Sequence, residues 1–153
     1  MLLAALALSN DARLDASGTA TGDPTETALF NLAMERGFLR EELDVKFPRL
    51  AEIPFDSDRK LMTTFHPWDT TRVVSFTKGA VEEILGRSEK VLTLRGKEEI
   101  DLSKILEVTE QITGQGLRAL GFGLRVWESL PDQLNFRQVE TRLILLGIVG
   151  MMD

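Results

Sequence analysis

The chain carries few of the side chains that perform covalent or metal chemistry. It has no cysteine, which excludes disulfides, thiolate nucleophiles and cysteine-based zinc or iron–sulfur sites. Its one histidine, His66, rules out a multi-histidine metal site, but it could act as acid or base in a small hydrolase with Asp69 or Asp58 as partner. Because it begins the turn-rich insert His66–Asp69, we expect a solvated loop histidine.

Four short segments combine charged, glycine and apolar side chains in patterns that could hold a ligand. In chain order they are Gly22–Leu29, Pro54–Met62, Lys78–Ala80 and Gly116–Leu120. Two of them have simple structural explanations. Asp23 and Glu26 are spaced for a helix capping box with Pro24 at the first helical position. A lone Phe55 in a strand is commonly a core residue.

The remaining charged residues also have ordinary interpretations. Arg59 and Lys60 could be a solvated pair balanced by Asp56 and Asp58, and Lys78 could be a surface residue at the end of a strand. The chain contains no GxxxxGK[ST] motif and no Rossmann glycine fingerprint, so a nucleotide would be held by side chains and not by a glycine-rich backbone cradle.

Taken in order, the four segments closely resemble the nucleotide-binding domain of P-type cation-transporting ATPases, nearest to the calcium-pump-like branch and its bacterial members. The run Gly147–Asp153 is similar to the strand that leads back into the phosphorylation domain of such pumps. The resemblance spans Leu3 to Asp153. It implies a single nucleotide-binding domain over residues 1–153, with an α+β fold in which helices flank a mostly antiparallel sheet.

The resemblance also implies a set of nucleotide-binding residues. They are Glu26, Phe55, Lys60, Met62, Lys78, Gly79, Ala80, Arg118 and Leu120. In the family, the residue matching Phe55 stacks on the adenine ring, and such stacking is worth roughly 1–3 kcal/mol. The residue matching Glu26 lies near the adenine amino group, and the one matching Met62 lines the same pocket.

The other matching residues surround the same ligand. The family's equivalent of Lys78 lies deep in the adenine pocket, where Gly79 would let the backbone come close to the ligand. Lys60 and Arg118 match residues near the phosphates, while Leu120 matches a hydrophobic wall. Ser57 stands where many calcium pumps carry an arginine, so one phosphate contact is missing.

The resemblance implies ATP as ligand, with Mg-ATP in the intact pump, and the phosphorylation and actuator domains as partners. The parent would be an ATP-driven pump of the plasma membrane or an organelle membrane, with this domain in the cytoplasm. No DKTGT motif occurs, so the isolated chain is expected to bind ATP or ADP without forming a phosphoenzyme. We expect it to be a monomer. The alternative to nucleotide binding, besides the hydrolase, is a protein-interaction module that pairs through its last strand.

The elements that must position these residues follow from the apolar pattern. Helices are predicted over Met1–Leu14, from Pro24 to Gly37, over Val81–Arg87 and from Ser103 to Thr113, with Asp15–Gly22 as a loop. The last helix should bury Ile105, Leu106, Val108 and Ile112. Strands are predicted around Leu50–Phe55, interrupted by Pro54, then over 61–65 and 73–77 as one hairpin, and over 91–94 and 99–102 as another. Leu117–Trp127 and Arg142–Met151 complete the sheet, and Lys78–Ala80 is expected to end its strand.

Composition sets the remaining limits. The chain of 153 residues has 43% hydrophobic residues and a formal charge of −6, which fits a globular domain with a real core. The negative charge argues against a nucleic-acid or anionic-membrane binder, although local cations can still hold a small anion. Apolar stretches at both ends, Met1–Leu8 and Leu143–Met152, are too short to cross a bilayer and suggest a domain of a longer chain.

Overall fold

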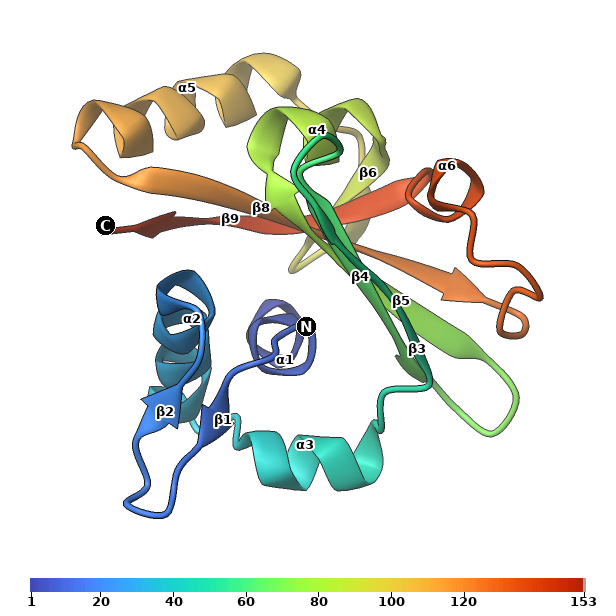
Figure 1. The fold of residues 1–153 in the computed structure, drawn as a ribbon. Coiled ribbons are helices and arrows are strands. Elements are labelled where there is room, and N and C mark those ends of the chain that lie inside the picture. The colour runs from blue at the N-terminus through green and yellow to red at the C-terminus, as the bar shows by residue number, and fades with distance from the viewer. Residues whose placement is uncertain (153) are drawn as a thin grey trace.

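A seven-stranded sheet forms the centre of the computed structural model, which describes residues 1–152 (Figure 1). Across the sheet the strands are β3 (Ala51–Asp56), β4 (Leu61–Pro67), β5 (Val73–Ala80), β8 (Arg118–Trp127), β9 (Leu143–Met151), β6 (Ser88–Thr93) and β7 (Gly96–Glu98). Only β6 and β9 pair in parallel within this sheet. The predicted α+β fold with a mostly antiparallel sheet is confirmed.

Helices cover both faces of the sheet. The helices are α1 (Leu2–Leu8), α2 (Pro24–Glu35), α3 (Arg40–Lys46), α4 (Val81–Gly86), α5 (Leu102–Gly114) and α6 (Phe136–Val139). Figure 1 shows α1, α2 and α3 on one face, together with the ribbon of β1 (Arg13–Leu14) and β2 (Ala20–Thr21), and α4 and α5 on the other. In residues 1–152, no helix has the length and apolar character needed to cross a membrane.

The main core lies between the sheet and α1 with α2. Phe76, Phe122 and Leu124 from the sheet pack there against Leu6 of α1 and Leu29 of α2. A smaller cluster on the opposite face joins Leu61, Leu143 and Leu145 to Ile84 of α4. Burial of apolar surface at about 25 cal/mol per Å² therefore stabilises the sheet from both sides.

The hairpin of β4 and β5 is confirmed, and both strands extend beyond the predicted ranges. Lys78–Ala80 does not break the strand after Thr77 as expected, because these residues are the last three of β5 and continue its ladder with β4 and β8. Their partners include Met62 for Lys78 and Leu120 for Ala80. The three residues are consequently held by two neighbouring strands before α4 begins.

The first helix is shorter than predicted. α1 ends at Leu8, because the Asn10 side chain donates to Leu6 O at 3.1 Å and accepts from Ala12 N at 2.8 Å, which turns the chain. Residues Arg13–Leu14 then form β1, and the predicted loop Asp15–Gly22 contains its partner β2. This turn brings the segment after α1 back against α2.

Helix ends and helix faces differ from the predictions in three places. The α2 capping box is wrong in one half: Asp23 accepts from Thr25 N and Glu26 N, whereas the Glu26 carboxylate turns elsewhere. The N-cap of α5 is Asp101 and not Ser103, since its side chain accepts from Lys104 N. Leu106 and Val108, predicted to be buried, are exposed. α3 was not predicted.

Candidate functional site

The predicted site residues gather at one end of the sheet. Because neighbouring strands run in opposite directions, the end of β3, the start of β4, the end of β5 and the start of β8 meet there. Met62 pairs with Lys78, and Leu120 pairs with Ala80, so these four residues share the face covered by α1 and α2.

Phe55 lies at this end on the edge strand β3. The register shifts between Ile53 and Asp56, whose partners are Thr63 and Leu61, so Pro54 and Phe55 together oppose Met62. Pro54 is tolerated because an edge strand needs no inward N–H there. Phe55 is 61% exposed, so the core interpretation of this ring is wrong. A bulge therefore presents an aromatic ring beside Met62.

Lys78, the strand partner of Met62, forms an ion pair with Glu26 on the face of the sheet covered by α1 and α2. Lys78 Nζ lies 2.9 Å from Glu26 Oε1, and it also donates to Ser9 O at 2.5 Å. The second carboxylate oxygen of Glu26 accepts from Asp11 N at 3.2 Å. This explains why Glu26 does not close the capping box: its carboxylate joins β5 to the segment after α1.

The surroundings of Lys78 lower its pKa. Burial is the largest cause, because it disfavours the ammonium form, and the negative charges of Glu26 and Asp11 oppose the shift only in part. Two arginines bind the same stretch of backbone: Arg49 donates to Leu8 O at 3.1 Å, and Arg40 donates to Ala12 O at 3.3 Å. The carbonyl groups at the end of α1 and just after it thus accept hydrogen bonds from three cations: Lys78 of β5, Arg40 of α3 and Arg49 of the segment between α3 and β3.

Arg118 lies on the neighbouring strand β8 and contacts the same helix end. Its Nη1 donates to Thr25 Oγ1 at 3.2 Å, so the first turn of α2 contacts both Lys78 and Arg118. A cavity of about 360 Å³ lies beside it. Its lining residues are Asp23, Pro24, Thr25, Arg118, Met151 and Met152. Arg118 therefore borders open space next to a helix N-terminus.

Gly79 is required by the protein backbone. A Cβ at this position would lie 2.0 Å from Lys60 O, and the residue has a φ of +156°, which side chains other than hydrogen rarely allow. The Lys60 carbonyl accepts from Ala80 N at 3.2 Å, and Lys60 itself has a φ of 61°. The sequence predicted that a ligand would approach the Gly79 backbone closely, and in the structure the turn before β4 approaches it closely. Lys60 belongs to that turn, and its side chain is exposed.

Arg59 is not the solvated residue that its charged neighbours suggested. Its guanidinium pairs with Glu140, with Nε 2.6 Å from Oε2, and only 9% of the Arg59 side chain is exposed. Glu140 is fully buried just before β9. Sequence reasoning missed Glu140 because a single glutamate 81 residues away carries no local pattern.

The hydrolase alternative built on His66 is wrong in its geometry. His66 is a buried residue of β4, and its ring nitrogens bond Phe47 O at 3.0 Å and Thr64 Oγ1 at 2.9 Å. Burial lowers the pKa of His66 to about 4. Asp69, its proposed partner, instead accepts from Arg72 at 2.7 Å. His66 is therefore a satisfied core histidine.

Comparison with known proteins identifies the arrangement. The family model described as the P-type ATPase cytoplasmic domain N matches residues 1–153. The chain belongs to the P-type ATPase family. The match is to the N domain of this family, so the prediction made from the four segments is confirmed.

Relatives with similar sequences are cation- and calcium-transporting ATPases that are much longer than this chain. This N domain is 39% identical over 150 residues to the cation-transporting ATPase pma1 of Synechocystis, covering 95% of this chain and 16% of the relative. It is 36% identical to calcium-transporting ATPase 1 of Bacillus cereus, over 100% of this chain and 17% of the relative. A probable cation-transporting ATPase F of Mycobacterium bovis is 37% identical over 99% and 17%. The chain thus spans about a sixth of the length of these relatives.

Within this N domain, the predicted residues fall into two groups. Met62, Lys78 and Glu26 form a connected set under the bulge that carries Phe55, and Arg118 lies beside Thr25 on the next strand. Met62 and Lys78 are nearly buried, whereas Phe55 offers an open aromatic surface on which a flat ligand can stack. An anionic extension of that ligand would find the cations Lys60 and Arg118 at the same end of the sheet.

Proposed function

We propose that this N domain binds ATP by its adenine end and presents the phosphates to the phosphorylation domain of a cation-transporting P-type ATPase. The observation that carries the proposal is the exposed Phe55, set by the bulge opposite Met62, whose other strand partner is the Lys78 of the Lys78–Glu26 pair. An exposed aromatic ring costs free energy in water, and covering it with a base recovers that cost. The relatives are cation- and calcium-transporting ATPases, which supports a cation pump with calcium as the first candidate ion.

Each residue has a distinct role in this proposal. Phe55 stacks on the adenine, Met62 and Leu120 wall the ring, and Glu26 accepts from the exocyclic amino group through a spare lone pair. Lys78 lies beside the base with its charge offset by Glu26. Ala80 adds only a methyl group beside it, and Gly79 contributes through its backbone, which lets the turn that carries Lys60 pack against β5.

The phosphates extend away from this base site toward open solvent. Lys60 and Arg118 offset part of their charge, since the domain as a whole carries −6. Mg²⁺ arrives with ATP as part of the substrate. The N domain then acts by positioning: it holds the adenosine so that the γ-phosphate reaches an aspartate of the phosphorylation domain, on the cytoplasmic side of the membrane. The actuator domain is the other partner within the same pump.

Calorimetric titration of the chain with ATP tests the proposal. Phe55→Ala should weaken binding about 5- to 150-fold, the equivalent of roughly 1–3 kcal/mol for one lost stack. Leu94→Ala is the matched control, because Leu94 is a fully exposed apolar residue between β6 and β7, at the far side of the sheet. Equal ATP affinity in the wild type and Phe55→Ala would overturn the assignment. No binding by the wild type would favour an interaction module instead.

A further inference from the structure

One side chain, Arg59, bridges the two sides of the turn that carries Phe55 and Lys60. Arg59 Nη2 donates to Pro54 O at 2.9 Å and to Leu61 O at 3.0 Å, which are the two sides of the turn between β3 and β4. One guanidinium group therefore fixes the spacing of the two strand ends. Phe55 directly follows Pro54 in the chain, and Lys60 directly precedes Leu61.

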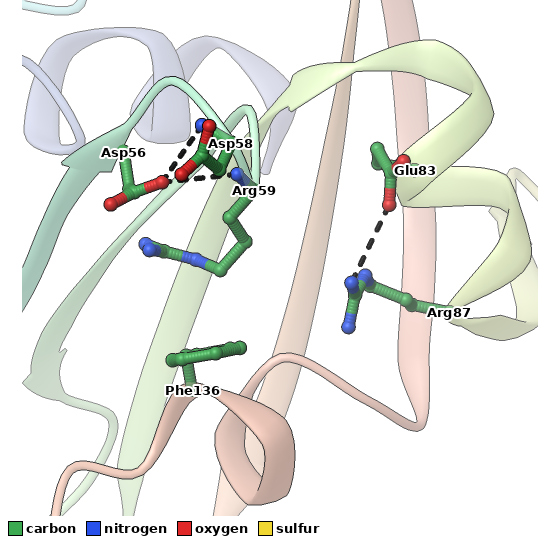
Figure 2. Close-up of a pocket in the computed structure, with 6 residues that line it drawn as sticks. All are labelled: Asp56, Asp58, Arg59, Glu83, Arg87 and Phe136. Atoms are coloured by element: carbon green, nitrogen blue, oxygen red, sulfur yellow. Dashed lines mark hydrogen bonds and ion pairs between the residues drawn. The ribbon is translucent and has the colours of Figure 1, made fainter.

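Arg59 is itself anchored to a distant part of the chain. Its Nε and Nη2 donate to the two carboxylate oxygens of Glu140, at 2.6 and 3.2 Å. This two-point contact fixes the plane of the guanidinium as well as its position. Figure 2 shows the Arg59 side chain extending from the turn toward the ring of Phe136 on α6, and the guanidinium lies 5.1 Å from the centre of that ring.

Two further side chains, Thr63 and Arg87, hold Glu140. Thr63 Oγ1 of β4 donates to Glu140 Oε1 at 2.8 Å and accepts from Thr77 Oγ1 of β5, also at 2.8 Å. Arg87, which follows α4, donates to the Glu140 carbonyl at 3.2 Å. A fully buried carboxylate with these partners has one orientation available, so it transmits a fixed position to Arg59.

Besides Arg59, the turn is held to β5 by Lys60 O, which accepts from Ala80 N at 3.2 Å. Asp56 accepts from Asp58 N at 2.8 Å and Arg59 N at 3.1 Å, which closes the turn locally but ties it to no other element (Figure 2). Phe55 is mostly exposed, so the backbone decides where its ring lies. Arg59 connects that backbone to the core, because it bonds both the turn carbonyl groups and the buried carboxylate of Glu140.

We propose that Glu140 and Arg59 are positioning residues for nucleotide binding, which act by fixing the turn that presents Phe55 and Lys60. The inference rests on the proposed function, since it concerns the affinity of the same site. Neither residue touches the nucleotide. Most of their contribution reaches the ligand through the stacked ring of Phe55, so most of it should vanish when Phe55 is absent.

A double-mutant cycle on ATP affinity tests this. Glu140→Gln keeps the shape and removes the charge, and we expect it to weaken ATP binding three- to tenfold in the wild-type background and less than 1.5-fold in the Phe55→Ala background. A residue that only supports the fold would lower affinity by the same factor in both. Glu83→Gln is the matched control. Glu83 lines a second cavity, whose other lining residues are Asp56, Asp58, Arg59, Arg87 and Phe136 (Figure 2), and the substitution removes its pair with Arg87, so ATP affinity should be unchanged.

Amide relaxation measurements without nucleotide give a second readout. In Glu140→Gln the amides of residues 55–60 should become mobile on the nanosecond scale, whereas Glu83→Gln should keep them rigid. If Glu140→Gln does not fold, Arg59→Lys serves in its place, because it keeps the charge and loses the second contact to Glu140. Equal losses in both backgrounds, or a turn that stays rigid, would overturn the inference. Failure of the wild type to bind ATP would overturn the proposed function itself.

Discussion

Lys78 Nζ lies 2.9 Å from Glu26 Oε1, and the two side chains are only 10% and 15% exposed. The pair connects β5 to the first turn of α2 across 52 residues of sequence. A cation held in this way can face a ligand without bringing an uncompensated charge into a partly dry site. The same pair stabilises the domain and forms the floor of the proposed base site.

Breaking this pair from one side should destabilise the domain. Lys78→Met leaves the Glu26 carboxylate without its counter-ion, and we expect a loss of about 2 kcal/mol in the free energy of unfolding, between the values for exposed and for fully buried pairs. The double variant Lys78→Met with Glu26→Gln should recover about 1 kcal/mol of that loss. Urea unfolding of the four proteins measures the coupling. Strictly additive losses would show that the contact contributes nothing.

Gly79 should tolerate no side chain. Gly79→Ala places a Cβ 2.0 Å from the Lys60 carbonyl oxygen at a φ that alanine disfavours, so we expect a loss of about 3 kcal/mol or more in unfolding free energy. Gly86→Ala at the end of α4 is the control, since a Cβ there meets no atom within 4 Å. Thermal unfolding should separate the two variants clearly. A Gly79→Ala domain as stable as Gly86→Ala would contradict the close approach.

Acid should destabilise the domain through His66. The pKa of His66 is about 4 in the folded chain and 6.5 in the unfolded chain, so the unfolded chain binds more protons between these values. Stability from this residue is complete above pH 6.5 and falls as the pH drops toward 4. Between pH 7 and pH 5 the wild type should lose about 2 kcal/mol more than His66→Gln. Parallel pH profiles for the two proteins would contradict a buried, neutral His66.

The sequence was informative where local pattern decides structure. The β4–β5 hairpin followed from alternation, and α2 followed from Asp23 and Pro24. It was misleading where distant residues decide the outcome. Nothing near Arg59 in the chain indicates Glu140, and nothing near Glu26 indicates that its carboxylate would choose Lys78 over the helix cap.

The same limit applies to the site. Residue types could be assigned to adenine or phosphate only through the family resemblance, because Phe55 alone fits a core position equally well. Its exposure depends on the bulge at the edge of the sheet, which is a property of the pairing with β4. The hydrogen bonds of His66 likewise depend on Phe47, which lies in a separate segment.

Nucleotides that share the adenine should bind with similar affinity. The proposed site holds the base with five side chains and the phosphates with two, and the overall charge of −6 opposes a polyanion. ADP should therefore bind within about tenfold of ATP, a gap of about 1.4 kcal/mol, with dissociation constants of roughly 0.1 to several mM. Calorimetry with ATP, ADP and AMP measures this series. A nanomolar affinity for ATP alone would point to a phosphate cradle instead.

Mapping of amide chemical shifts during an ATP titration tests the central claim most directly. The largest shifts should fall at Phe55, Lys60, Met62, Lys78 and Ala80, with smaller ones at Arg118, and AMP should reproduce the shifts around Phe55 while leaving Arg118 nearly unmoved. Those residues should saturate together with one dissociation constant. Shifts centred instead on Glu83, Arg87 and Phe136 around the other cavity, or no saturable shift at all, would contradict adenine binding at Phe55.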